Sequence, residues 1–257
     1  MKYWELTRPE LERVDREAVV VLLPLGSCEQ HGHHLPVYTD SYLVSEVATG
    51  VEQRLRERVL LLPTLWVGAS EHHLAFGATV SVAPLQYVQL LISMGDSILR
   101  QGFRRLFLLN GHGGNIEPMR VALRELKQRY RRAVLVAAAY WEVAEGQIAR
   151  WCRGARKEIG HAGEVETALL LATRAELVRR ELLRDEPGRP EPDGLYVART
   201  LAEQSVSGAV GYPTKATAEG GRELLERIVD AVSRVVDEVL RLPAPESIWS
   251  TEAREQP

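Results

Sequence analysis

All seven histidines of this 257-residue chain fall in four short segments. They are His31, His33 and His34; His72 and His73; His112; and His161. Each segment also carries carboxylates, glycines or an asparagine, which are the usual neighbours of histidine in metal or acid/base sites. Histidines kept only for packing would be scattered along the chain. The clustering therefore predicts metal-dependent hydrolytic chemistry.

The first segment delivers Glu29, His31 and Asp40 within twelve residues. Glu29 and His31 are two positions apart, so in an extended segment both side chains point the same way. Asp40 begins a predicted helix and could bridge two cations, and imidazole with carboxylate suits zinc, manganese or iron. The alternative is that Asp40 is an ordinary N-cap and the histidines lie on the loop surface.

The second segment is Asn-Gly-His-Gly-Gly-Asn at positions 110–115, between a predicted strand and a predicted helix. Its glycines permit a sharp turn that exposes backbone amides, near Gly113, to an anion or oxyanion. His112 would be a metal ligand. The alternative is a glycine-rich turn with a bystander histidine.

The third segment spans 158–167 and contains His161, Glu164 and Glu166. Either glutamate could complete a second metal site from the first turn of a helix, and His161 is placed to move protons. Alternatively, the two glutamates only favour the helix N-terminus electrostatically.

The intervening sequence alternates between strand and helix patterns. Apolar runs at 17–25, 59–62, 105–109 and 133–139 predict strands, and helical spacing covers 40–56, 85–100, 115–127, 162–173 and 219–240. We expect Gly102 to stop one helix, Asn115 and Thr217 to cap two others, and the charged stretch 179–193 to be a surface excursion. This order predicts an α/β domain over 1–257 with a mostly parallel sheet covered on both sides. Its chemistry-bearing loops should converge at the carboxyl ends of the strands.

Composition excludes several classes of function. The net charge is only −3, so a nucleic-acid or anionic-membrane partner is not expected. The two cysteines give no disulfide framework and indicate a reducing, cytoplasmic location. The charged N-terminus is no signal peptide, and no apolar run reaches the ~18 residues of a membrane span.

Three ordered motifs resemble the creatininase family of metal-dependent amidohydrolases. They are EQHG-x-HLP-x-x-TD, NGHGGN and HAGE-x-ET, and the match spans about 19–167 and resumes at 207–221. The resemblance implies a three-layer α/β/α sandwich, two divalent metal ions, and a homo-oligomer that is often a hexamer. Zinc is the first choice of metal, with manganese or iron as alternatives.

The resemblance also implies roles for residues of this chain. Glu29 and His112 would hold one metal, His31 the other, and Asp40 would bridge them. His161 matches the catalytic histidine and Glu158 an acid near the substrate. Creatininase takes a further ligand from a glutamate where this chain has Gly114, and Glu164 would replace it.

Gly114 makes creatinine hydrolysis doubtful and favours other branches of the family. These hydrolyse formamides of pyrimidine or flavin precursors, trim the mycofactocin precursor peptide, or open other small cyclic substrates. Ser70 and His72 resemble a family loop that lines the substrate pocket, where they would bond substrate or orient a ligand. Trp141 would form a pocket wall, or else a core or interface aromatic.

The expected reaction is hydrolysis of an amide, formamide or lactam C–N bond in a small molecule or short peptide. A water between two cations has its pKa lowered from ~16 towards ~7, and the bridging hydroxide would attack the carbonyl carbon. Amides near Gly113 would stabilise the oxyanion, and His161 with Glu158 would protonate the leaving nitrogen. The alternatives are a cysteine-dependent amidase using Cys28 with His31 or His161, a non-catalytic metal- or nucleotide-binding module, and a structural subunit.

Overall fold

Four parallel strands form the central sheet of the chain, which we describe from a computed structural model covering residues 1–189 and 194–243. The strands are β1 (Val20–Leu25), β2 (Val59–Leu61), β3 (Arg105–Asn110) and β4 (Val134–Ala139), in the order β2-β1-β3-β4. All four predicted strands are present; β1, β2 and β4 are shorter than predicted, and β3 is one residue longer. Strand β2 lies on one side of β1, and the next strand in sequence, β3, lies on the other side. The strand order therefore reverses between β1 and β3, and ligands of open α/β sheets bind at such a point.

Strand β1 is buried on both faces, as its unbroken apolar sequence predicts. Successive side chains point to opposite faces of a sheet, so Val20 and Leu22 belong to one hydrophobic cluster and Val21 and Leu23 to the other.

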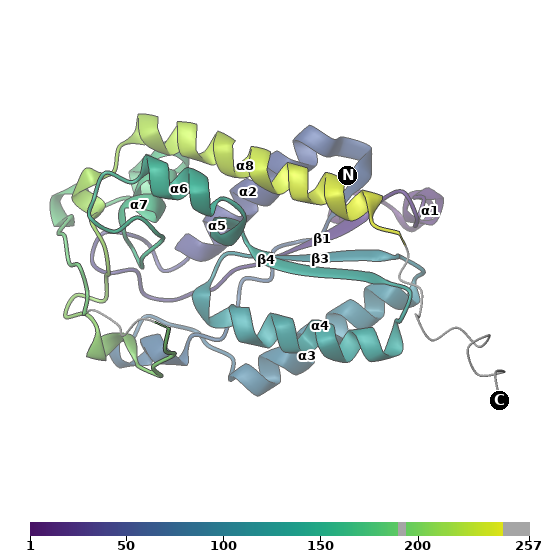
Figure 1. The fold of residues 1–257 in the computed structure, drawn as a ribbon, viewed down its shortest axis with the longest axis horizontal. Helices are drawn as coiled ribbons and strands as arrows, with labels where there is room; N and C mark the ends of the chain where they lie inside the picture. The colour runs from purple at the N-terminus through teal and green to yellow at the C-terminus, as the bar shows by residue number, and fades with distance from the viewer. Residues whose placement is uncertain (190–193, 244–257) are drawn as a thin grey trace.

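Helices cover both faces of the sheet, which confirms the three-layer architecture (Figure 1). One face carries α3 (Pro84–Arg100) and α4 (Ile116–Arg129). The other carries α2 (Thr39–Leu55), α5 (Tyr140–Val143), α6 (Glu145–Trp151), α7 (Glu164–Thr173) and α8 (Ala218–Arg241). A short α1 (Arg8–Arg13) lies near the N-terminus. Within the described ranges, no helix combines the length and apolarity that crossing a bilayer requires.

Of the three residues predicted to begin or end helices, Thr217 and Gly102 are confirmed and Asn115 is wrong. Thr217 Oγ1 accepts a hydrogen bond from the Gly220 amide and caps α8, and Gly102 follows the end of α3 with φ +94°. Asn115 makes no capping hydrogen bond at α4. Its side chain instead accepts from the Ala69 amide (3.0 Å) and donates to Gly26 O (3.0 Å), so it ties three loops together. The excursion at 179–193 lies partly outside the described residues.

Helices α7 and α8 pack closely because α8 carries a glycine at their contact. A Cβ at Gly221 would lie 1.9 Å from Ala168 O, which is backbone and cannot rotate away.

We expect Gly221→Ala to lower the free energy of unfolding by about 1–3 kcal/mol, the usual cost of overpacking. The matched control is Gly146→Ala in α6, where a Cβ would meet nothing closer than 3.6 Å and helix propensity favours alanine. Urea unfolding followed by circular dichroism measures both. Equal stability of the two variants would contradict the packing argument.

Candidate metal centre

Three carboxylates and two imidazoles meet in a buried cluster at the carboxyl ends of β1 and β3. Glu29 and His31 come from the loop after β1, Asp40 from the first turn of α2, His112 from the turn after β3, and Glu166 from α7. His31 Nε2 lies 3.0 Å from Asp40 Oδ1 and 3.8 Å from Glu166 Oε1. His112 Nδ1 lies 3.1 Å from Glu29 Oε1 and 3.2 Å from Asp40 Oδ2.

The cluster divides into two sets of potential ligands that share Asp40. One set is Glu29, Asp40 and His112, and the other is His31, Asp40 and Glu166. Within each set the ligand atoms lie within 4.8 Å of one another. One carboxylate thus faces two neighbouring cation positions.

Backbone carbonyls fix which nitrogen of each imidazole faces the carboxylates. His31 Nδ1 donates to Glu29 O (3.0 Å), which leaves Nε2 towards Asp40. His112 Nε2 donates to Ala69 O (3.1 Å), which leaves Nδ1 towards Glu29 and Asp40. An imidazole whose second nitrogen is held in this way presents a lone pair to a metal.

The electrostatics of the cluster also suit divalent cations. Glu29 Oε1 and Asp40 Oδ2 are buried without a hydrogen-bond partner among the described residues. Burial lowers the pKa of His31 and His112, but the charges of Asp40 and Glu29 outweigh it and raise both pKa values well above normal. The carboxylates therefore draw positive charge into the site, as protons or as metal ions, and the residues present fit two divalent ions.

Glu164 lies elsewhere, contrary to the expectation that it replaces the glutamate missing at position 114. Its carboxylate accepts hydrogen bonds from the backbone amides of Arg153 (3.0 Å) and Gly154 (2.8 Å). Residues two apart at a helix start point in different directions, so only Glu166 reaches His31 and Asp40. Gly114 itself has no room for a side chain, because a Cβ there would lie 2.0 Å from Ala69 O.

Glu158 also differs from expectation. Its side chain is 70% exposed and pairs with Arg156 at 2.9 Å, and it lines a neighbouring hollow instead of the pocket over the cluster. The chain between Glu158 and His161 turns the carboxylate towards solvent.

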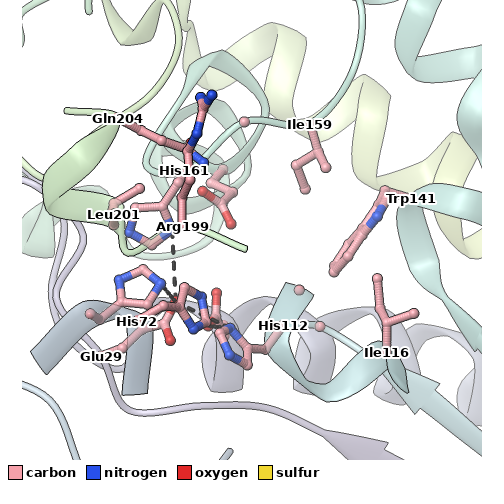
Figure 2. A pocket seen from close by; sticks show the side chains of 16 residues that line it. Glu29, His72, His112, Ile116, Trp141, Ile159, His161, Arg199, Leu201 and Gln204 are labelled. Atoms are coloured by element: carbon pink, nitrogen blue, oxygen red, sulfur yellow. Dashed lines mark ion pairs between the residues drawn. The ribbon is translucent and has the colours of Figure 1, made fainter. Parts of the chain in front are cut away.

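A pocket of about 330 Å³ opens over the cluster (Figure 2). His72, Gly113 and Trp141 line it, as the sequence predicts for a substrate site. Ser70 does not line it. The Ser70 hydroxyl is buried between Ser27 Oγ (2.6 Å) and His112 Nε2 (3.1 Å), so it contacts the His112 imidazole from outside the pocket.

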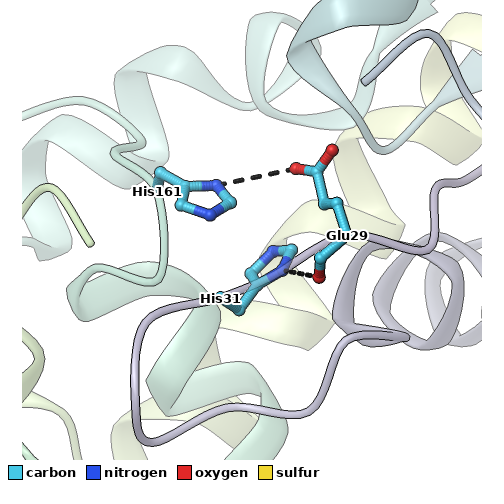
Figure 3. Close-up of side chains that lie close together, drawn as sticks. All are labelled: Glu29, His31 and His161. Carbon is cyan, nitrogen blue, oxygen red and sulfur yellow. Dashed lines mark hydrogen bonds and ion pairs between the residues drawn. The ribbon is translucent and has the colours of Figure 1, made fainter. Parts of the chain in front are cut away.

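His161 stands beside Glu29 and His31 (Figure 3). Its Nε2 donates to Gln30 O (2.8 Å), so Nδ1 faces Glu29 Oε1 at 3.7 Å. Burial, helped by the charge of His31, lowers the pKa of His161 to about 3. His161 is therefore a neutral base at the pocket wall. It also forms a third potential ligand set with Glu29 and His31.

Sequence reasoning missed two residues that position this cluster. His73 Nε2 lies 3.2 Å from Glu29 Oε1, and Gln30 Nε2 donates to His73 Nδ1 (3.0 Å) and to Gly208 O (3.0 Å). Both residues stand inside recognised motifs. Only their contacts with residues distant in sequence show that they hold the cluster in place.

Known proteins resemble this chain in sequence. The sequence model of the creatininase family, described as creatinine amidohydrolase, matches residues 4–236. The chain belongs to the creatininase family. The chain is 36% identical to a mycofactocin precursor peptide peptidase of Mycobacterium ulcerans (strain Agy99), over 84% of each sequence. It is 29% identical to a creatinine amidohydrolase of Pseudomonas putida, over 91% of this chain and 95% of that one.

Solved creatininase structures share the fold. A mutant creatininase superposes with a TM-score of 0.82 at 26% identity, covering 94% of this chain and 99% of the other. A Zn–Zn form of creatininase gives a TM-score of 0.79 at 28% identity over 94% of this chain and 98% of that chain. A manganese form gives 0.79 at 27% identity over 94% and 99%. Family membership makes hydrolase activity the general function of this chain.

The different positions of Glu164 and Glu166 give a direct test. We expect Glu166→Gln to lower the metal content from near two ions per chain to near one, because the amide loses the charge that faces His31 and Asp40. Glu164→Gln should keep its metal and lose about 1–3 kcal/mol of stability from weakened bonds to backbone amides. Elemental analysis and thermal unfolding separate the two effects. If Glu164→Gln lost metal and Glu166→Gln did not, Glu164 would be the metal ligand, as the sequence predicted.

Proposed function

We propose that this chain is a dinuclear metal-dependent amidohydrolase that cleaves a C–N bond of a small molecule or short peptide. The observation that carries the proposal is the pair of buried ligand sets that share Asp40. Glu29 and His112 would hold one ion, His31 and Glu166 the other. Zinc is the first choice, and solved creatininase structures include a Zn–Zn form and a manganese form.

Two ions bound there would polarise the substrate carbonyl and acidify water. The chain supplies the remaining functions. Gly113, in the turn after β3, carries no side chain and leaves the pocket floor open to the substrate carbonyl. His161 Nδ1, directed at the cluster, would deliver a proton to the leaving nitrogen. Trp141 and Ile159 close one side of the pocket against water.

A cysteine amidase is less well supported. Burial and the charges of Glu29 and Asp40 raise the pKa of Cys28, so its thiol is protonated at neutral pH and is a poor nucleophile. Cys28 is also not among the residues that line the pocket.

The substrate is better sought among peptides and small amides than creatinine. Identity to the mycofactocin precursor peptide peptidases reaches 36%, against 29% for the creatinine amidohydrolase. A pocket of about 330 Å³ suits a small molecule or the end of a peptide, because ligand pockets typically measure about 300–1,000 Å³. A peptidase of the mycofactocin type is therefore the second candidate within the same chemistry.

Metal removal tests the proposal as a whole. We expect protein purified without chelator to hold near two divalent ions per chain, and Asp40→Ala to lose most of both because both sets share that carboxylate. Chelation should abolish hydrolysis of formamides, lactams and short peptides, and zinc or manganese should restore it. Iodoacetamide treatment is the control. Activity that survives chelation and is lost on alkylation would favour the Cys28 alternative.

His161→Ala tests the proton-transfer role separately. We expect turnover to fall by about 10²- to 10⁴-fold, the usual contribution of general acid–base catalysis, with metal content unchanged. Elemental analysis of the same samples used for kinetics decides the matter. Loss of an ion from His161→Ala would make His161 a ligand in the third set, with Glu29 and His31.

A further inference from the structure

One wall of the pocket comes from a segment that supplies no residue to the ligand sets. Arg199, Leu201 and Gln204 face the pocket from this side, and Ile116, Trp141 and Ile159 form the opposite wall (Figure 2). The metal-binding cluster lies at the base between them. The two walls differ in chemistry, since one is apolar and the other carries a guanidinium.

The chain that follows Arg199 is held in place at two points. The short helix η7 (Leu201–Glu203) packs against η3 (Glu71–Phe76), and Leu201 is buried. Further along, the Glu186 carboxylate accepts from the Val206 and Ser207 amides. Arg199 therefore immediately precedes an anchored stretch of backbone.

The Arg199 side chain makes no hydrogen bond or ion pair with any residue that the structure describes. The charges of Arg199 and nearby Glu203 attract each other, but Glu203 Oε2 accepts its hydrogen bonds from Thr200 N (2.7 Å) and Thr200 Oγ1 (2.8 Å) and none from Arg199. Among the pocket-lining residues, Arg199 is the one side chain with a permanent positive charge. A guanidinium at a pocket wall whose N–H groups donate to no described residue is a ready partner for an anion.

We propose that Arg199 binds a carboxylate of the substrate. This assignment rests on the proposed amidohydrolase function. The substrate is then an amide, or the end of a peptide, that carries a free carboxylate beside the scissile C–N bond. The group on the other side of that bond is apolar and packs against Trp141 and Ile159. The planar fork of arginine matches a carboxylate with two parallel hydrogen bonds.

The electrostatics of the pocket make this anchor selective. The carboxylates of Glu29, Asp40 and Glu166 repel an anion at the pocket base unless cations neutralise them. Arg199 offers the anion a position away from these acids, so a substrate carboxylate orients the carbonyl towards the metal ions. A neutral amide of the same size has no carboxylate for Arg199 to hold, so its carbonyl is not oriented in this way.

The test uses metal-loaded protein and two hydroxamates that differ only in charge at one end. Succinic acid monohydroxamate carries a carboxylate, and its primary-amide counterpart does not. Isothermal titration calorimetry of wild type should show the carboxylate form binding about 10- to 100-fold more tightly, as expected for hydrogen bonds to a charged group. Arg199→Gln should remove this preference, and Arg199→Lys, with charge but no fork, should keep part of it.

The matched control is Arg153→Gln, which removes the same charge from an exposed side chain outside the pocket lining and should leave the preference intact. Equal binding of both hydroxamates by wild type that holds two ions would overturn the inference and leave the amidohydrolase proposal standing. A third hydroxamate carries a phosphonate in place of the carboxylate. If wild type binds it more tightly than the carboxylate form, the carboxylate assignment is overturned. Absence of both metal and hydroxamate binding would overturn both proposals together.

Discussion

The burial of three carboxylates against one another is the constraint on which the rest of the site depends. Glu29, Asp40 and Glu166 are 1%, 3% and 4% exposed, and an uncompensated buried charge costs several kcal/mol. Two imidazoles lie against these carboxylates, and backbone carbonyls dictate which nitrogen each presents. A centre built in this way has little freedom to relax without cations, which is why the donor set supports metal binding better than an ordinary ion-pair network does.

The sheet and its glycines bring the carboxylates and imidazoles together. The loops after β1 and β3 must both pass close to the first turns of α2, because Asp40 lies there. A Cβ at Gly26 would lie 2.3 Å from Ser41 Oγ, and a Cβ at Gly111 would lie 2.7 Å from Val44 Cβ. Glycine at both positions lets two neighbouring strands end directly against the helix. The spacing of glycines in the motifs thus follows from packing as much as from catalysis.

The sequence predicted the four strands, the main helices and the first-loop residues Glu29, His31 and Asp40, because these depend on local patterns and on one strand edge. It misplaced Glu164, whose carboxylate accepts hydrogen bonds from amides that lie eleven and ten residues earlier in the chain. No local signal marked Arg199, whose position depends on how η7 packs against η3. The prediction of one domain over 1–257 remains untested, as does the homo-oligomer that the resemblance implies.

In the proposed metal centre, Glu166 supplies the carboxylate for which Gly114 leaves no room. Position 114 lies under Ala69 O, where a side chain has no space, so the turn after β3 supplies His112 alone to the ligand sets. The missing carboxylate comes instead from α7, on the opposite side of His31. Since α2 and α7 contact each other and both pack against α8, the second ligand set belongs to one helical layer. The proposed metal centre would therefore join that layer to the sheet, and its occupation would be coupled to the packing of the helices around it.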